Sequence, residues 1–237
     1  KAGYFGSECD GGYAQYTKVS HRQVHPIKST MSDAELATFA CSYVTAENML
    51  NRGAVTAGDT VLVTGASGGV GSALIQLANR RGAQCVGLCG ADKADDVKAV
   101  GPLAVIDRNC SDLGSALRDA IGKESVDVVA DVVGGLLWPQ LINALARGGR
   151  YTCAGAIAGP MVEFDLRTFY LRDLTFTGAT VPLPGVFEDL VGYIERDEIR
   201  PLLAATYPLE NFHAAQQAFI DKRHVGNIVT EPFGPAT

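Results

Sequence analysis

The stretch Val61-Leu62-Val63-Thr64-Gly65-Ala66-Ser67-Gly68-Gly69-Val70-Gly71 decides the fold of this chain. It opens on an apolar run, which is typical of a strand buried on both faces of a parallel sheet. A glycine turn follows, and the turn in this position, between a strand and a helix, predicts a phosphate site. Glycine lets the main chain approach the phosphate, and the helix N-terminus faces its charge. Apolar residues then recur at helical spacing at Val70, Ala73, Leu74, Leu77 and Ala78.

Strands and helices alternate beyond this turn as far as residue 180. Such alternation predicts a doubly wound parallel sheet with helices on both faces, that is, an α/β fold of the Rossmann type. The predicted strands are 60–64, 84–89, 103–107, 126–130, 150–153 and 174–180, and the predicted helices are 92–100, a helix capped by Ser111 and ending at 121, 138–146, and a short one at 165–171.

The pattern changes on both sides of this region. In the opening residues, Tyr13 to Val19 alternate as in a strand, and Ser32 with Glu35 three residues later predicts a capped helix. After Pro182-Leu183-Pro184-Gly185 we expect helices at 186–196 and 209–220 and strands at 203–207 and 227–230. We expect this last part to pack with the opening forty residues.

The composition excludes several classes of protein. The chain has 237 residues, 47% hydrophobic and 19% charged, which excludes intrinsic disorder. Its net charge of −6 argues against nucleic acid or an anionic membrane as the main partner. The uncharged run from Thr60 to Asn79 is broken by glycines, so it is a strand and a helix rather than a membrane span. The six cysteines are scattered and form no Cys-x-x-Cys pair, which predicts reduced thiols in a cytoplasmic protein.

Other nucleotide-binding patterns do not match the glycine turn. A P-loop requires lysine followed by serine or threonine after its last glycine, but Ser72 and Ala73 follow Gly71. The short-chain dehydrogenase pattern matches Thr64 to Gly71. That family, however, places the turn near the start of the chain and uses a Tyr-x-x-x-Lys pair, and no tyrosine here has lysine four residues later.

Segments spread over nearly the whole chain resemble the medium-chain dehydrogenase/reductase superfamily. The glycine turn looks most similar to that of its quinone-oxidoreductase-like branch. The chain starts at Lys1 rather than at methionine, and we expect most of the family's amino-terminal, chaperonin-ten-like half to be absent. Besides the glycine turn, the segments that carry the resemblance are Asp10–Tyr16, Cys41–Ala46, Ala57–Val63, Asp127–Gly135, Gly148–Tyr151 and Gly226–Val229.

The resemblance implies a division of the chain and a function. Residues 1–43 would be the remnant of the catalytic domain, 44–181 the dinucleotide-binding domain, and 182–237 a return to the catalytic domain. The expected activity is hydride transfer between NAD(P)H and a carbonyl, enone or quinone. The family also implies a homodimer joined through the edge strand Leu174 to Thr180.

The end of the second strand bears on which nicotinamide is used. NAD enzymes usually place Asp or Glu there to bind the ribose hydroxyls, whereas this chain has Cys89 and Gly90. Lys93 follows closely and could pair with a 2′-phosphate. Asp92 and two further aspartates are near, and no arginine is close in sequence. On balance the residues favour NADP over NAD.

The glycine turn and Lys93, with further residues that the resemblance implies, would hold the cofactor, and no residue is identified as the catalytic acid. Tyr43 is a weak candidate for that role, and Ile157 is more easily explained by packing. The predicted cofactor-binding residues are Thr45, Ser67, Gly68, Gly69, Val70, Lys93, Val133, Gly155, Ala156 and Asn227.

A metal site is the less favoured interpretation. Cys41 stands where some zinc alcohol dehydrogenases of the superfamily have a ligand to catalytic zinc. One cysteine does not hold zinc, which needs three protein ligands, so we expect Cys41 to be a small buried residue and zinc to be absent. Two alternatives stay open: a zinc-dependent alcohol dehydrogenase, and a dinucleotide-binding protein without catalysis. The substrate and the oligomeric state are not determined by these residues.

Overall fold

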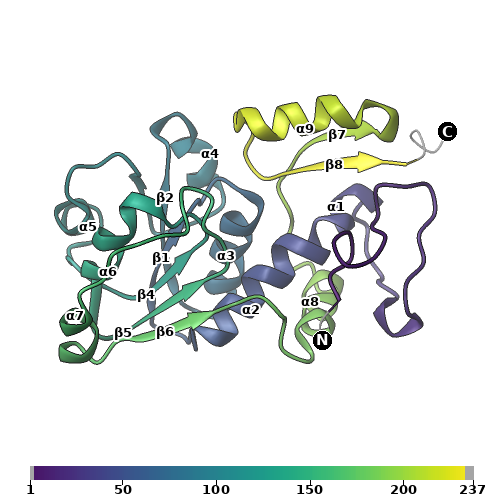
Figure 1. Ribbon diagram of the computed structural model, residues 1–237. Helices are drawn as coiled ribbons and strands as arrows, with labels where there is room; N and C mark the ends of the chain where they lie inside the picture. Colours follow the sequence, from purple (N-terminus) through teal and green to yellow (C-terminus); the bar gives the residue numbers. More distant parts are fainter. Residues whose placement is uncertain (1–2, 233–237) are drawn as a thin grey trace.

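The computed structural model describes residues 3–232 and is built around a parallel sheet of six strands (Figure 1). The strands lie in the order β3-β2-β1-β4-β5-β6. This is the strand order of a doubly wound dinucleotide-binding sheet, so the predicted α/β fold is confirmed. The strands are β1 (Thr60–Thr64), β2 (Gln84–Cys89), β3 (Ala104–Asp107), β4 (Val126–Asp131), β5 (Leu145–Cys153) and β6 (Thr175–Gly178).

Helices connect these strands, and none of the described helices has the length and apolar content to span a membrane. The longest of those described has twelve residues. The helices of this part are α2 (Val44–Arg52), preceded by the π-helical turn η2 (Phe39–Tyr43), α3 (Gly69–Arg80), η3 (Ala91–Lys93), α4 (Ala94–Ala99), α5 (Leu113–Ile121), η4 (Gly135–Leu137), α6 (Trp138–Asn143) and α7 (Leu166–Leu171).

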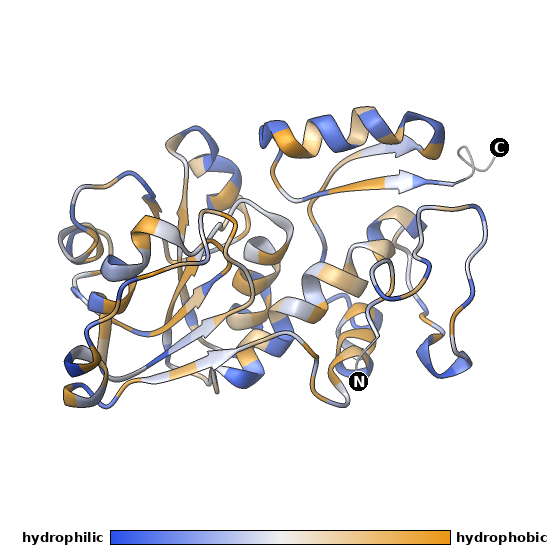
Figure 2. Cartoon of the chain, viewed as in Figure 1, coloured by the Kyte–Doolittle hydropathy of each residue, from blue (hydrophilic) through white to orange (hydrophobic). Residues whose placement is uncertain are grey.

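Both faces of the sheet are buried under helices. Val61 and Val63 of β1 belong to one apolar cluster with residues of α2, α3 and α4, whereas Leu62 belongs to another with α5 and α6. Successive strand residues point to opposite faces, so a continuous apolar run is what a doubly covered strand requires. In Figure 2 the central strands of the sheet are largely hydrophobic, in agreement with this arrangement.

Several predicted boundaries differ from the structure. Asp112 rather than Ser111 caps α5, since its carboxylate accepts the Ser115 N–H at 2.5 Å. Strand β5 begins at Leu145, which pairs with Val126 before the register shifts. Helix α6 therefore ends earlier than predicted. The predicted strand over residues 13–19 is wrong: this segment is exposed and irregular, and it pairs with no strand of the described chain.

The last part of the chain forms a second, smaller sheet against the opening residues. Strands β7 (Leu203–Pro208) and β8 (Asn227–Glu231) pair in parallel, and η5 (Leu209–Asn211) and α9 (Phe212–Asp221) connect them. Helix α1 (Asp33–Ala37) contacts both strands, and its predicted cap is confirmed by the capping box of Ser32 and Glu35. Helix α8 (Val186–Glu195) packs on α2 (Figure 1).

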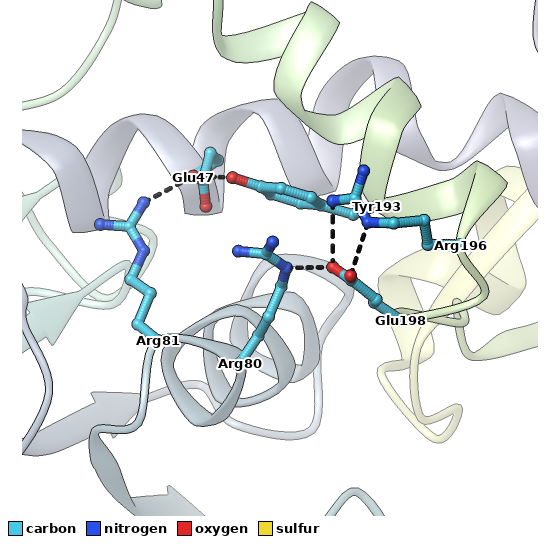
Figure 3. Close-up of polar contacts among 6 residues, drawn as sticks. All are labelled: Glu47, Arg80, Arg81, Tyr193, Arg196 and Glu198. Carbon is cyan, nitrogen blue, oxygen red and sulfur yellow. Dashed lines mark hydrogen bonds and ion pairs between the residues drawn. The ribbon is translucent and has the colours of Figure 1, made fainter.

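A polar cluster joins α2, α3 and α8 (Figure 3). Glu47 is 2% exposed and accepts from Arg81 at 2.6 Å. The Arg80 guanidinium lies 3.4 Å from the centre of the Tyr193 ring, and both Arg80 and Arg196 pair with Glu198. This cluster fixes the part of the chain that crosses between the two sheets.

Candidate functional site

The glycine turn is packed so closely that the fold itself requires glycine at some of its positions. Gly65 has a φ of 59°, in the left-handed region that favours glycine. A Cβ atom at Gly71 would lie 2.1 Å from the Gly65 carbonyl oxygen. The main chain therefore doubles back on itself between β1 and α3, and only glycine is accommodated at Gly71.

Helix α3 begins at this turn with its amino end uncovered. Gly68 occupies the N-cap position in extended conformation, and no side chain among residues 3–232 caps the helix. The first N–H groups of a helix have no partner within it and carry partial positive charge. Here they border a cleft of about 790 Å³ whose lining includes Ser67, Gly68, Gly69, Val70 and Gly71. The geometry suits an anion.

The β8 end of the smaller sheet forms the opposite wall of the cleft. The Gly226 N–H donates to Ser67 O at 2.8 Å, and Gly68 and Gly226 form a parallel bridge. Ser42 Oγ donates to Asn227 Oδ1 at 2.6 Å beside Gly69, where a Cβ atom would lie 2.1 Å from that same oxygen. Asn227, one of the predicted cofactor-binding residues, thus lines the cleft, and its amide oxygen accepts from Ser42.

The other end of the cleft gathers charged side chains. Lys93, which the sequence suggested as a partner of a 2′-phosphate, lines it together with Asp92 and Lys222. Arg108, which follows β3, also lines the cleft. Its main-chain N–H donates to the Cys89 carbonyl at the end of β2. No arginine is close to Lys93 along the chain, but Arg108 lines the same cleft. Parallel pairing of Cys89 with Asp107 brings the two strand ends together, and the order of the residues along the chain does not reveal this.

The residues predicted after the later strands are placed unevenly. Val133 lines the cleft, and so do Ile157 and Ala158. Gly155 and Thr45 are not among the described residues of its wall, and neither is Ala156. A Cβ atom at Gly155 would lie 2.8 Å from Val132 O, so close packing of two loops explains this glycine.

A buried carboxylate supports the loop that carries Val133. Asp131, at the end of β4, has no exposed surface and accepts from Thr64 Oγ1 and Tyr151 Oη, each at 2.6 Å. It also accepts the main-chain N–H groups of Val133 and Gly134. Burying a charge is costly unless it is hydrogen-bonded, and these four donors satisfy it. The spacing of residues along the chain does not reveal this network, because Thr64, Asp131 and Tyr151 lie on three separate strands.

Two further expectations are corrected by burial. Tyr43 is fully buried, its hydroxyl donates to Arg200 O at 3.1 Å, and burial raises the pKa of its phenol. It therefore does not face the cleft as a proton donor. Cys41 was expected to be buried, but it is exposed and lines the cleft. The π-helical turn η2 presents Cys41 outward while it buries Tyr43.

The residues of the cleft fit a phosphorylated dinucleotide better than they fit zinc. The uncapped α3 terminus and the cations at the far end match a molecule with one anionic group in its middle and another at its end, as in a phosphorylated dinucleotide. For zinc the fit is poor: among residues 3–232 no three His, Cys, Asp or Glu side chains gather as ligands. Another hollow, of about 890 Å³, is lined by the loop of residues 6–18, and the Tyr13 ring of this loop lies 4.5 Å from the Phe212 ring at the start of α9.

Similarity to known proteins agrees with this geometry. A family model described as zinc-binding dehydrogenase matches residues 69–196. An acryloyl-coenzyme A reductase of Metallosphaera sedula is 30% identical over 95% of this chain and 66% of its own length. A quinone oxidoreductase of Sus scrofa is 25% identical over 92% of this chain and 68% of its own.

Solved structures also resemble the chain over nearly its whole length. A candidate alcohol dehydrogenase of Sinorhizobium meliloti 1021 is 47% identical with a TM-score of 0.93, covering 97% of this chain and 64% of that one. The 2-octenoyl-CoA carboxylase reductase CinF, solved with NADP and 2-octenoyl-CoA, is 25% identical with a TM-score of 0.91, covering 98% of this chain and 57% of its own. The chain thus spans about two thirds or less of the length of these proteins.

Proposed function

The chain belongs to the zinc-binding dehydrogenase family within the medium-chain dehydrogenase/reductase superfamily, and from this premise we propose that it is an oxidoreductase. It transfers hydride between NADP(H) and a carbonyl, enone or quinone. The observation that carries the proposal is the uncapped start of α3 at the glycine turn, inside a cleft with cations at its far end. The relatives that reduce quinones and acryloyl-coenzyme A support the substrate class.

The glycine turn binds the pyrophosphate in this proposal. The N–H groups of Gly69, Val70 and Gly71 point their partial charge into the cleft, and Gly65 lets the chain turn without a side chain in the way. A nicotinamide, when bound, supplies the hydride. The protein orients the ring and keeps water from it, with Val133, Ile157 and Ala158 among the apolar residues of the wall. We assign no catalytic acid.

NADP(H) rather than NAD(H) is proposed from the charges at the far end. Lys93, Arg108 and Lys222 line that end against one carboxylate, Asp92. A guanidinium binds phosphate oxygens in a planar, two-pronged arrangement, and one such charged hydrogen bond is worth about 1.5–3 kcal/mol. Asp92 is the observation that favours NAD(H), since a carboxylate there would bind ribose hydroxyls and repel a 2′-phosphate.

The division of the chain and its assembly are also proposals. We place the dinucleotide-binding domain at 44–181 and the catalytic domain at 1–43 and 182–237, since β1 to β6 lie within the first range and β7 and β8 outside it. Strand β6 is an edge of the six-stranded sheet, and edges invite pairing with a second chain. We therefore propose a homodimer. A cytoplasmic location is supported by six cysteines that form no disulfide.

A zinc-dependent alcohol dehydrogenase is the second candidate, because Cys41 is exposed at the cleft. A structure bearing cobalt and zinc, an alcohol dehydrogenase of Pyrobaculum aerophilum, is 29% identical to this chain. One thiol does not make the site, so no step is assigned to metal. Metal analysis of the purified chain decides: zinc bound in equal amount, and its loss after Cys41→Ser, would favour this candidate.

The test of the main proposal separates binding from catalysis. The 237-residue chain is titrated with NADPH and NADH by fluorescence, and oxidation of each is then followed with a quinone, an enone, an enoyl-CoA and an aldehyde. We expect tighter binding of NADPH and its oxidation by at least one acceptor. Binding without oxidation by any of them would indicate a dinucleotide-binding protein without catalysis. Absence of binding would overturn the proposal.

A further inference from the structure

Lys93 reaches across the cleft instead of standing free in solvent. Its Nζ donates to the main-chain oxygen of Lys222 and to that of His224, the latter at 3.0 Å. Lys93 ends η3, directly after β2, whereas Lys222 and His224 lie in the loop between α9 and β8. One side chain therefore ties the six-stranded sheet to the smaller sheet.

The loop held by Lys93 also reaches the glycine turn. Two residues after His224, Gly226 has a φ of 92° and donates its N–H to Ser67 O. Asn227 follows and donates its N–H to Leu202 O at 2.8 Å. The loop of residues 222–227, which we call the clamp loop, thus contacts both ends of the cleft.

The position of the clamp loop brings like charges together. Lys222, in the left-handed conformation with a φ of 54°, lines the cleft beside Lys93 and Arg108. Burial and the nearby charge of Lys93 lower the pKa of the Lys222 ammonium. His224 Nδ1 is buried with no hydrogen-bond partner in the described structure. Burial is the main cause of the lowered pKa of His224, and the charges of Lys93 and Lys222 lower it further. Closing the loop therefore has an electrostatic cost.

An anion at this end of the cleft would remove that cost. An ammonium has three N–H donors, and Lys93 uses two of them on carbonyl groups. The third is available to a phosphate, and the charge of that phosphate would offset the repulsion between Lys93 and Lys222. NAD(H) has ribose hydroxyls at this position and offers no such charge.

We propose that Lys93 is a positioning residue that couples a 2′-phosphate to closure of the clamp loop, so that NADP(H) fixes the loop on the glycine turn and NAD(H) does not. A ligand shifts such an equilibrium only through its different affinity for the two states, and the phosphate supplies that difference. The inference rests on the proposed dinucleotide site. It adds that the choice of cofactor is transmitted to the second sheet.

The test is amide hydrogen exchange of the peptide that spans the clamp loop. Wild-type chain is measured free, saturated with NADP, and saturated with NAD. We expect NADP to slow exchange at Gly226 and Asn227 about tenfold more than NAD, which corresponds to ~1.4 kcal/mol. In Lys93→Gln the two dinucleotides should protect the loop equally, while both still bind through the glycine turn. Lys93→Arg, which keeps the charge and the donors, should restore part of the difference.

Lys98→Gln is the matched control. Lys98 lies in α4, five residues after Lys93, pairs with Asp95 at 2.8 Å and does not line the cleft in the described chain, so this variant should behave as wild type. Equal protection by NADP and NAD in the wild type, or an undiminished difference in Lys93→Gln, would overturn the coupling. Failure of both dinucleotides to bind would instead overturn the proposed function. Thermal unfolding of each variant establishes that it is folded.

Discussion

The two ends of the cleft are built in different ways. At the glycine turn the surface offered to a ligand is main chain, and packing of Gly65, Gly69 and Gly71 against neighbouring backbone and side chains holds it in place. At the far end the surface offered to a ligand consists of the side chains of Lys93, which is half-buried, and Arg108, which is exposed. The first end is part of the core of the fold, whereas the second is attached to it.

Because of this difference, one end of the cleft determines the affinity for a dinucleotide and the other determines the selectivity between NADP(H) and NAD(H). An end made of main chain binds any pyrophosphate and tolerates few substitutions, because each substitution disturbs the sheet as well as the site. An end made of charged side chains can change from one dinucleotide to the other with little effect on folding. We therefore expect stability and binding to change together at the glycine turn and separately at the far end.

Gly71→Ala should have the largest effect. The added methyl would lie 2.1 Å from Gly65 O and 2.7 Å from Ala66 Cα, both of them backbone atoms. Overpacking of this kind costs about 3 kcal/mol in the free energy of unfolding, and dinucleotide binding should be lost with it. Urea unfolding and NADPH titration measure both. Gly114→Ala in α5 is the control: its methyl meets only ordinary contacts, at 3.6 Å from Asp112 Oδ1, so stability should be unchanged or slightly raised.

Asp131→Asn should follow in size. The amide would place an NH₂ group against donors that now bond the carboxylate, so about 2 kcal/mol of unfolding free energy should be lost. The loop of Val133 and Gly134 should loosen, and the affinity for NADPH should fall as well. Tyr151→Phe, which removes only one of the four donors, is the milder comparison. A stable Asp131→Asn variant with unaltered affinity would contradict the role given to this network.

Arg108→Gln should change binding and leave stability alone. Loss of one charge-assisted bond to the 2′-phosphate, about 1.5–3 kcal/mol, would weaken NADPH binding about tenfold or more. NADH binding should not change. Arg167→Gln, which removes a cation paired with Asp165 on the surface away from the cleft, serves as the control. A parallel loss of NADH affinity would mean that Arg108 supports the fold of this end rather than its choice of cofactor.

Glu198→Gln should have the smallest effect, confined to pH. Hydrogen bonds from Arg196 and Arg80 lower the pKa of Glu198 from 4.5 to about 2 (Figure 3). A depressed pKa in the folded state adds stability above the unfolded pKa, and this stability is lost as the pH falls toward the folded value. The variant should thus be slightly less stable than wild type above pH ~4.5 and equal to it near pH ~2. Urea midpoints over this range test it, and a constant difference at every pH would exclude the ion pairs as its cause.

The local pattern of residues was sufficient for the large sheet. An apolar run such as Thr60 to Thr64 is stable only between two layers of helices, and the glycines after it allow only one kind of turn. Helix boundaries were predicted less well, because caps such as Asp112 compete with neighbouring residues of similar propensity. The segment from Tyr13 to Val19 has the alternation of a strand, but a strand also needs a partner, and alternation does not supply one.

The sequence by itself determined the α/β architecture, the glycine turn and the family resemblance, since each depends on residues that are close along the chain. Only the tertiary structure decided that Arg108 joins Lys93 at the cleft, that Asp131 supports the loop of Val133, and that Tyr43 is buried while Cys41 is exposed. These contacts join residues from different strands and helices. Their geometry is set by parallel register and by the packing of two sheets, and neither can be derived from the spacing of residues in one segment.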